Sequence, residues 1–322
     1  MKAALCERYG PPDVVRVADV PTPQPGASEV LVRVRAATLT AADRASRSGV
    51  PRYARLFFGL RRPRSPVLGS EFAGEVAAVG SGVTAFAAGD RVYGQTLSGA
   101  HAQYVLVPSD GALAPMPAGV DATQAATLVD GTALVFLRDH AKLQPGQSVV
   151  VNGASGSVGC MAVQWARHFG ADVTAVCGSP AGADLVRTLG ASRVVDYRTA
   201  DFTREPHRYD VVFDVAGASS FRRSRGRLHR GGSYLTTVPS AAILAQMPWT
   251  ARFGNRRAVI AFTGLRPAAD KVTGLRLVKE LVEAGRLVPV VDSTYPLERI
   301  ADAYRHLDSG GRTGTIVVTM PD

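Results

Sequence analysis

Short runs of hydrophobic residues alternate with helical patterns through the second half of the chain. The run at 148–151 is rich in β-branched residues, ends in a glycine-rich turn, and precedes an amphipathic helical pattern at 160–169. Further strand-like runs follow, with a helical pattern at 183–189 among them; they cover 172–177, 193–196, 210–215, 232–237 and 258–263. Strands and helices that alternate at this spacing predict an α/β fold with a doubly wound parallel sheet.

The first third of the chain shows a different pattern. Positions 31–36 alternate between hydrophobic and polar residues, as they do in a half-buried strand. Glycines and prolines bound further strand-like runs at 69–80, 89–94 and 102–108. Short strands with such turns predict a partly open β-barrel. One more run, at 314–319, follows a helical pattern at 271–284, and we expect it to return to this first domain.

The turn after the run at 148–151 carries a pattern of small residues. Ala154-x-Gly156-x-x-Gly159 stands where a dinucleotide-binding turn has G-x-G-x-x-G, with alanine in the first position. A glycine at 156 lets the backbone approach a pyrophosphate, and a glycine at 159 lets the helix pack closely on the strand. The first helical N–H groups then face the anion. We predict that this turn binds a dinucleotide through Asn152, Gly153, Ala154, Ser155, Gly156, Ser157, Val158 and Gly159.

Composition narrows the classes of partner. The formal net charge is +10, and nearly all the positive charge is arginine, which gathers at 61–64 and 222–230. Such clusters bind an anionic partner or are simply solvated at the surface; because no nucleic-acid-binding motif accompanies them, we favour solvated arginine and expect no nucleic acid. No apolar run is long enough to span a membrane, no secretory signal is evident, and the three cysteines lie far apart. We therefore expect a cytoplasmic protein with no membrane partner.

Several motifs together carry a family resemblance over nearly the whole length; they are 9–12, 29–34, 66–74, 89–92, 144–147, the turn at 152–159, 189–191 and 195–197. By these motifs the chain resembles a zinc-independent medium-chain dehydrogenase/reductase of the quinone oxidoreductase-like branch. The resemblance implies a GroES-like, partly open β-barrel domain, a Rossmann domain, an active site in the cleft between them, and often a homodimer. We expect the GroES-like domain at 1–123, the Rossmann domain at 124–285, and a return to the first domain at 286–322.

The residues at the zinc positions of this family can be read directly. Zinc-dependent relatives carry a cysteine ligand where this chain has Thr40, and a histidine where it has Ser70. The six histidines show no paired spacing, and a zinc site needs three or four protein ligands. We therefore predict no metal. Without zinc there is no Lewis acid to polarise an alcohol, which argues against plain alcohol oxidation.

The cofactor is predicted from the end of the second strand of the parallel sheet. A carboxylate there would bind the ribose 2′-hydroxyl of NAD, and residues 177–180 contain none. We therefore expect NADP(H) to be favoured over NAD(H). Ser179 either donates to the 2′-phosphate or is an ordinary turn residue. The resemblance places Tyr197 near the adenine end.

The resemblance also implies contacts to the nicotinamide from Thr132, from the loop with Val215 and Ala216, and from Phe262. It leaves the proton donor open, because many relatives have asparagine at Thr40 and tyrosine at Ala45. Thr40 and Tyr53 are candidate donors, although we favour Tyr53 as an ordinary, partly buried loop aromatic. Asp130 either caps the following helix or faces the nicotinamide with a raised pKa.

These observations predict an NADPH-dependent reductase that transfers hydride to a quinone or an α,β-unsaturated carbonyl compound, with a small apolar conjugated substrate. One alternative is a carbonyl reductase or alcohol dehydrogenase that works without zinc. Another is a regulatory or nucleic-acid-binding protein built on a cofactor-binding fold.

Overall fold

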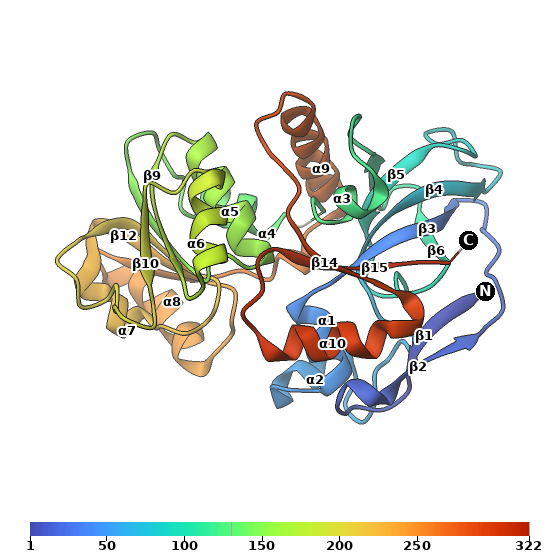
Figure 1. Cartoon of the computed structure of the whole chain (residues 1–322), viewed down its shortest axis with the longest axis horizontal. Coiled ribbons are helices and arrows are strands. Elements are labelled where there is room, and N and C mark those ends of the chain that lie inside the picture. Colours follow the sequence, from blue (N-terminus) through green and yellow to red (C-terminus); the bar gives the residue numbers. More distant parts are fainter. Residues whose placement is uncertain (130, 322) are drawn as a thin grey trace. The chain divides into compact units, whose positions relative to one another are not determined.

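Six parallel strands form one sheet in the second half of the chain, in the order β10-β9-β8-β11-β12-β13. Figure 1 labels β9, β10 and β12 of this sheet. The strands are β8 (Ser148–Asn152), β9 (Asp172–Cys177), β10 (Arg193–Asp196), β11 (Tyr209–Asp214), β12 (Leu228–Thr236) and β13 (Arg257–Ile260). Val149, Val150 and Val151 of β8 are fully buried, as expected for a strand that is covered on both faces. The strand order reverses beside β8, where such a sheet binds ligands at its carboxyl edge. The predicted doubly wound sheet is confirmed.

The helices around this sheet begin and end at residues that suit helix termini. They are α4 (Thr132–Leu134), which continues as the π-helix η3 (Val135–His140), then α5 (Ser157–His168), α6 (Pro180–Leu189), α7 (Phe221–Ser224), the 3₁₀ turn η4 (Arg225–Arg227) and α8 (Ala241–Phe253). Ser179 caps α6, with Pro180 in its first turn, and Gly190 ends it in a left-handed conformation. Trp165 of α5 is completely buried, so this helix is anchored on the sheet.

A second, mixed sheet joins the first part of the chain to its C-terminal part. Its order is β14-β15-β3-β4-β5-β7, and β6 also pairs with β3. The bounds are β3 (Glu29–Leu39), β4 (Glu71–Val79), β5 (Arg91–Gln95), β6 (Tyr104–Pro108), β7 (Ala112–Pro115), β14 (Val291–Pro296) and β15 (Thr315–Thr319). β15 lies antiparallel to β3, and β14 is parallel to β15. Its buried core includes Leu39, Phe72 and Tyr304.

Shorter elements complete the fold. They are the hairpin of β1 (Lys2–Cys6) and β2 (Val15–Asp19), the helices α1 (Ala41–Ser48), α2 (Arg55–Phe58), α3 (Ala122–Ala126), α9 (Ala268–Glu283) and α10 (Ile300–Ser309), and the 3₁₀ turns η1 (Pro12–Val14), η2 (Arg52–Ala54), η5 (Thr263–Leu265) and η6 (Leu297–Arg299). α10 contacts β14 and β15. Within the described chain, no helix is both long and apolar enough to cross a membrane.

The computed structural model describes residues 1–129 and 131–321. The chain divides into two compact units: unit 1 comprises Met1–Asp130, Arg266–Gly310 and Thr315–Asp322, and unit 2 comprises Gly131–Leu265 and Gly311–Gly314. α9 belongs to unit 1, where the hydroxyl of Tyr93 on β5 donates to the carbonyl of Leu275 at 2.5 Å. We expected this helix in the nucleotide-binding domain, so the compact units do not coincide with the domain boundaries at 123 and 285, which stay a prediction.

Candidate functional site

The turn after β8 is fixed against the neighbouring strand. The backbone N–H groups of Gly153 and Ala154 both donate to the carbonyl of Val176, at 3.1 and 3.0 Å. Gly153 has a φ of +87°, a conformation that favours glycine, and a Cβ there would lie 2.9 Å from the Cβ of Ala216. These contacts therefore fix the shape of the strand end and of the first part of the turn.

Gly156 and Gly159 have different surroundings. A Cβ at Gly159 would lie 2.1 Å from the carbonyl oxygen of Gly153, so this glycine is required for close packing of α5. A Cβ at Gly156 would meet only the oxygen of Gly153, at 3.7 Å, which is ordinary contact. Open space therefore lies beside Gly156, at the N-terminus of α5, where Ser157 and Val158 form the first helical turn. This arrangement fits a dinucleotide pyrophosphate.

A segment from unit 2 that lies far along the sequence also reaches this turn. The N–H of Gly314 donates to the carbonyl of Ser155 at 2.8 Å, and Gly156 and Gly314 form an isolated parallel bridge. Sequence reasoning missed this segment; its only signal is the glycine pair at 310 and 311.

Asn152 supports the site rather than facing it. Its side-chain amide donates to the carboxylate of Asp214 at 2.8 Å, and Asp214 is completely buried. The hydroxyl of Tyr234 and the N–H of Ser219 donate to the same carboxylate, each at 2.8 Å. Burial, together with the charge of Asp214, raises the pKa of Tyr234, which keeps its hydroxyl a donor. This network fixes the start of the loop after β11.

Two predicted cofactor contacts lie in that loop. The N–H groups of Val215 and Ala216 both donate to the backbone carbonyl of Asn152, at 3.0 and 3.1 Å. The loop is thereby tied to the end of β8, beside Gly153. Val215 and Ala216 therefore lie next to the glycine-rich turn.

Ser179 and Tyr197 lie at the carboxyl ends of β9 and β10. The hydroxyl of Ser179 accepts from the N–H of Gly182 at 3.0 Å, so Ser179 is a helix cap whose own hydrogen can still be donated. The Tyr197 ring covers Gly178, since a Cβ on that glycine would lie 2.3 Å from the ring. Asp196 ends β10 and is paired with Arg198 at 2.7 Å. Hydrogen bonds from Arg198 hold the pKa of Asp196 below its usual range. The sequence had not drawn attention to Arg198, which is the basic residue next to Tyr197.

Thr132 and Phe262 belong to neighbouring segments of unit 2. The hydroxyl of Thr132 is 3.0 Å from that of Thr263, the residue after Phe262. The Phe262 side chain is 45% exposed, so its ring can contact a ligand. The structure thus brings these two predicted nicotinamide contacts together. Asp130, the third residue predicted near the nicotinamide, lies outside the described residues.

Thr40 begins α1 as its cap. Its hydroxyl donates to the Asp43 carboxylate at 2.7 Å and accepts from the N–H of Asp43 at 3.2 Å. The backbone N–H of Thr40 donates to the same carboxylate at 2.8 Å. Because a hydroxyl has one hydrogen to donate, this geometry counts against Thr40 as a proton donor to a substrate.

Tyr53 lies in η2 and is 38% exposed. Burial raises the pKa of its hydroxyl above the ordinary value, so the group keeps its proton at neutral pH. Leu56, Phe57 and Leu60 follow it with exposed side chains. Tyr53 therefore remains the candidate acid of unit 1, in an apolar part of its surface.

Residues close in sequence to the zinc positions of the family hydrogen-bond with one another. The hydroxyl of Thr38 donates to the buried carboxylate of Glu71 at 2.7 Å, and Nε2 of His101 is 2.9 Å from the carbonyl of Thr38. Thr40 and Ser70 supply neither thiolate nor imidazole. Across the residues the structure describes, no three His, Cys, Asp or Glu side chains gather in a way that could hold a metal ion. A zinc ion does not fit here.

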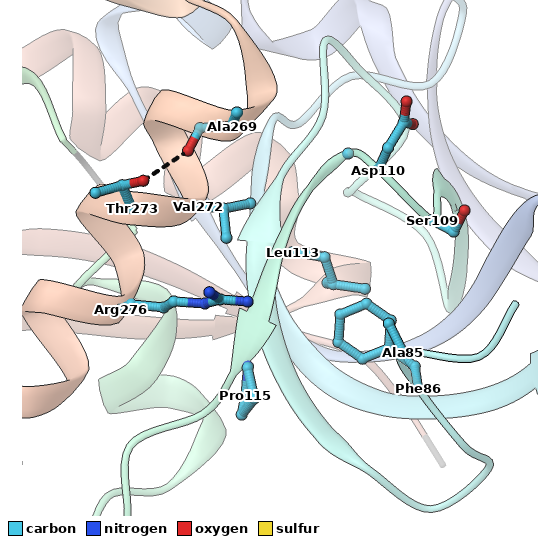
Figure 2. A pocket seen from close by; sticks show the side chains of 11 residues that line it. Ala85, Phe86, Ser109, Asp110, Leu113, Pro115, Ala269, Val272, Thr273 and Arg276 are labelled. Atoms are coloured by element: carbon cyan, nitrogen blue, oxygen red, sulfur yellow. Dashed lines mark hydrogen bonds between the residues drawn. The ribbon is translucent and has the colours of Figure 1, made fainter.

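A hollow of about 410 Å³ lies elsewhere in unit 1. Figure 2 shows Leu113 and Pro115 of β7 on one side of it and Val272 and Arg276 of α9 on another, with Phe86 nearby. None of the predicted site residues lines it. This hollow is therefore not part of the candidate site.

Comparison with known proteins adds two family matches. Residues 26–118 match the alcohol dehydrogenase GroES-like domain, and residues 189–318 match a family described as zinc-binding dehydrogenase. The second match includes neither Thr40 nor Ser70, so its description says nothing about a ligand at those positions.

Individual relatives are similar over nearly the whole chain. An NADPH-dependent alkenal/one oxidoreductase of Arabidopsis thaliana is 30% identical, covering 99% of this chain and 79% of the relative. The quinone oxidoreductase of Coxiella burnetii superposes with a TM-score of 0.87 at 26% identity, over 100% of this chain and 99% of that one. A quinone oxidoreductase of Escherichia coli, solved with NADPH, gives a TM-score of 0.85 at 25% identity, over 99% and 100% of the two chains.

Proposed function

The chain belongs to the medium-chain dehydrogenase/reductase family, in its quinone oxidoreductase-like branch, and from this we propose that it is an NADPH-dependent, zinc-independent reductase. Its reaction would transfer hydride to a quinone or an α,β-unsaturated carbonyl compound. The observation that carries the proposal is the open turn at Gly156, which ends a strand of a doubly wound sheet and begins α5.

NADPH, when bound, supplies the hydride from C4 of its nicotinamide. The backbone from Gly153 to Gly159 would hold the pyrophosphate, and the Gly311–Gly314 segment would border it. Ser179 and Tyr197 would contact the 2′-phosphate and adenine end, and the missing carboxylate at residues 177–180 supports NADPH over NADH. Thr132, Val215, Ala216 and Phe262 would contact the nicotinamide half.

We expect the hydride acceptor to be conjugated because few of the predicted site residues could stabilise negative charge localised on one oxygen atom. Negative charge on a carbonyl oxygen needs hydrogen-bond donors, and a conjugated acceptor spreads that charge. Thr40 gives its hydroxyl hydrogen to Asp43, so of the two donors predicted from the sequence the Tyr53 hydroxyl is the one left for a substrate. The exposed Leu56, Phe57 and Leu60 suit a flat apolar molecule.

Deuterium transfer tests the reaction. With NADPH deuterated at nicotinamide C4, the label should appear at the β-carbon of an enone product, as detected by NMR. Label at the carbinol carbon would instead identify a carbonyl reductase. If neither enones nor quinones oxidise NADPH in the presence of the protein, the proposal is wrong. NADH, titrated side by side in the same assay, should bind more weakly.

The proposal includes a homodimer that acts in the cytoplasm. β13 supports the dimer, because it is the last strand in the order of its sheet and an edge strand can pair with another chain. Sedimentation at several protein concentrations would measure the oligomeric state. A monomer at every concentration would contradict the proposed homodimer.

A further inference from the structure

A strand and a helix of unit 1 bring together polar side chains that the proposed function does not use. β14 and α10 contact one another, as Figure 1 shows. The buried side chains of Ile300, Ala303, Tyr304 and Leu307 hold α10 in place. His306 lies between the last two in sequence and has a side chain that is 31% exposed, so molecules in the solvent can reach it.

A β-bulge turns two consecutive residues of β14 toward this histidine. The register of β14 against β15 shifts between Val291 and Ser293, so Asp292 is an extra residue in the strand. Consecutive side chains of a regular strand point to opposite faces, whereas here Asp292 and Ser293 both reach His306. Bulges are frequent beside active sites, where they redirect a side chain.

The three side chains meet in the order carboxylate, imidazole, hydroxyl. A carboxylate oxygen of Asp292 lies 3.6 Å from Nε2 of His306, and Oγ of Ser293 lies 3.2 Å from Nδ1. Because an ionised carboxylate only accepts, it favours the imidazole hydrogen on Nε2. Nδ1 then has a lone pair that accepts the hydrogen of Ser293. The Asp292 side chain is only 8% exposed, so its charge is weakly screened by solvent.

A tyrosine supplies a second hydroxyl at the same nitrogen. Tyr295 follows Ser293 by two residues in β14, and its hydroxyl lies 3.1 Å from Nδ1 of His306. The single lone pair of Nδ1 accepts one hydrogen at a time. When Ser293 donates to Nδ1, the hydrogen of Tyr295 is therefore available for another acceptor, such as an oxyanion that forms beside Ser293.

We propose that Ser293, His306 and Asp292 form a second reactive site, which hydrolyses small carboxylic esters. Oγ of Ser293 attacks the carbonyl carbon of the ester while Nδ1 of His306 takes its proton. The bond from that carbon to the alcohol oxygen breaks, and the alcohol leaves with the proton. Water then attacks the acyl group and gives a proton to Nδ1, which returns it to Oγ as the carboxylic acid leaves. Asp292 positions the imidazole through these steps.

The second hydroxyl and the position of the cluster set this site apart. An ion pair that only joined the strand to the helix would be complete with Asp292 and His306, whereas here two hydroxyls converge on the other ring nitrogen. None of these residues lines the hollow of unit 1, and Ser293 is partly buried, so we expect a small acyl group. All of them lie in Arg266–Gly310 of unit 1, and none is proposed to bind NADPH. The proposal therefore does not rest on the reductase activity.

Hydrolysis of p-nitrophenyl acetate by the full chain tests the proposal. The protein should release many nitrophenolate molecules per chain, as measured by absorbance. S293A and H306Q should each slow this hydrolysis about 100-fold, the lower end of general-base contributions, because nucleophile and base act as a unit.

Two matched controls separate the site from background hydrolysis. T294A removes an exposed hydroxyl from the neighbouring position of β14 and should hydrolyse the ester as the original chain does. H207Q with H229Q removes two exposed histidines of unit 2, whose imidazoles can cleave an activated ester without any site, and should also retain the activity.

A fluorophosphonate probe gives a second readout, which needs no turnover. The probe should label Ser293, as located by mass spectrometry of the digested protein, and the label should be lost in H306Q. Thermal melting of the variants checks that each still folds.

NMR tests the positioning role of Asp292. Long-range ¹H–¹⁵N spectra of the original chain should show the hydrogen of His306 on Nε2. In D292N the new amide can donate to Nε2, so the hydrogen should move to Nδ1, which can then no longer take a proton from Ser293. D292N should therefore hydrolyse the ester as slowly as H306Q.

Four results would overturn the proposal. The first is hydrolysis that is unchanged in S293A. The second is hydrolysis that is lost in H207Q with H229Q and kept in H306Q. The third is a Ser293 that the fluorophosphonate does not label. The fourth is a tautomer of His306 that is the same in D292N as in the original chain.

Discussion

The hydroxyl of Thr40 has a single hydrogen, and the structure gives that hydrogen to Asp43. The sequence places Thr40 correctly among the residues that replace zinc ligands, but it cannot show how a side chain uses its hydrogen bonds. Asn152 is a second example, since its amide faces Asp214 within the protein. Candidate positions could be predicted because motifs fix them, whereas the donors left for a substrate depend on contacts distant in sequence.

The variant Tyr53→Phe tests whether the hydroxyl of Tyr53 donates a proton to the substrate. Reduction of an enone should slow by about 100-fold, the lower end of general-acid contributions, because carbon must be protonated after hydride arrives. Reduction of a quinone should change little. Steady-state rates with both acceptors check this, with Tyr104→Phe as a control at a partly buried tyrosine on β6.

The pH dependence follows from the same hydroxyl. Because burial raises the pKa of Tyr53, its proton is present at every pH below about 10, the ordinary tyrosine value. The rate with an enone should therefore show no loss of this donor between pH 7 and 9. If Tyr53→Phe slows enone and quinone reduction equally, Tyr53 is not the proton donor to carbon.

Among the elements, β8, its turn and α5 are the part that the sequence predicts best. Their signal is local, because a buried strand, small residues and a helix follow one another without interruption. α8 gave no comparable signal, since Pro248 interrupts it and apolar residues occur on every side. The Gly311–Gly314 segment was also missed, because its contact with Ser155 joins residues that are far apart in the chain.

The two glycines of the turn make a matched pair of variants. Gly156→Val should keep the melting temperature, because Gly156 has an extended backbone that any residue adopts and its Cβ would meet no close atom. It should abolish NADPH binding by filling the space for the pyrophosphate. Gly159→Val should destabilise the fold by about 3 kcal/mol, since its Cβ overlaps the Gly153 carbonyl. Thermal melts and NADPH titration separate the two, and retained affinity in Gly156→Val would contradict the site.

For the whole molecule, the doubly wound parallel sheet and the return of the last strand to the first domain were predicted from the alternation of patterns, but the strand order and the compact units were not. The hydrogen bond from Tyr93 to the Leu275 carbonyl shows why. α9 follows unit 2 in sequence but packs in unit 1, and only such long-range contacts show to which unit the helix belongs.

Metal dependence is also a property of the whole molecule. Activity should be indifferent to chelators, because neither Thr40 nor Ser70 is a zinc ligand and Glu71 already accepts from Thr38. Elemental analysis of the purified protein, before and after dialysis against a chelator, measures this. Stoichiometric zinc whose removal abolishes activity would refute the expectation.

The pairing of β15 with β3 has a consequence for synthesis on the ribosome. β3 is complete at Leu39, but its partner on one side is complete only at Thr319. Almost all of unit 2 lies between them in sequence, as the continuous stretch Gly131–Leu265. On that side β6 pairs with Glu29–Arg33, so the part of β3 left unpaired in the nascent chain is Ala36–Leu39. This short strand edge needs protection from neighbouring chains until translation is nearly finished.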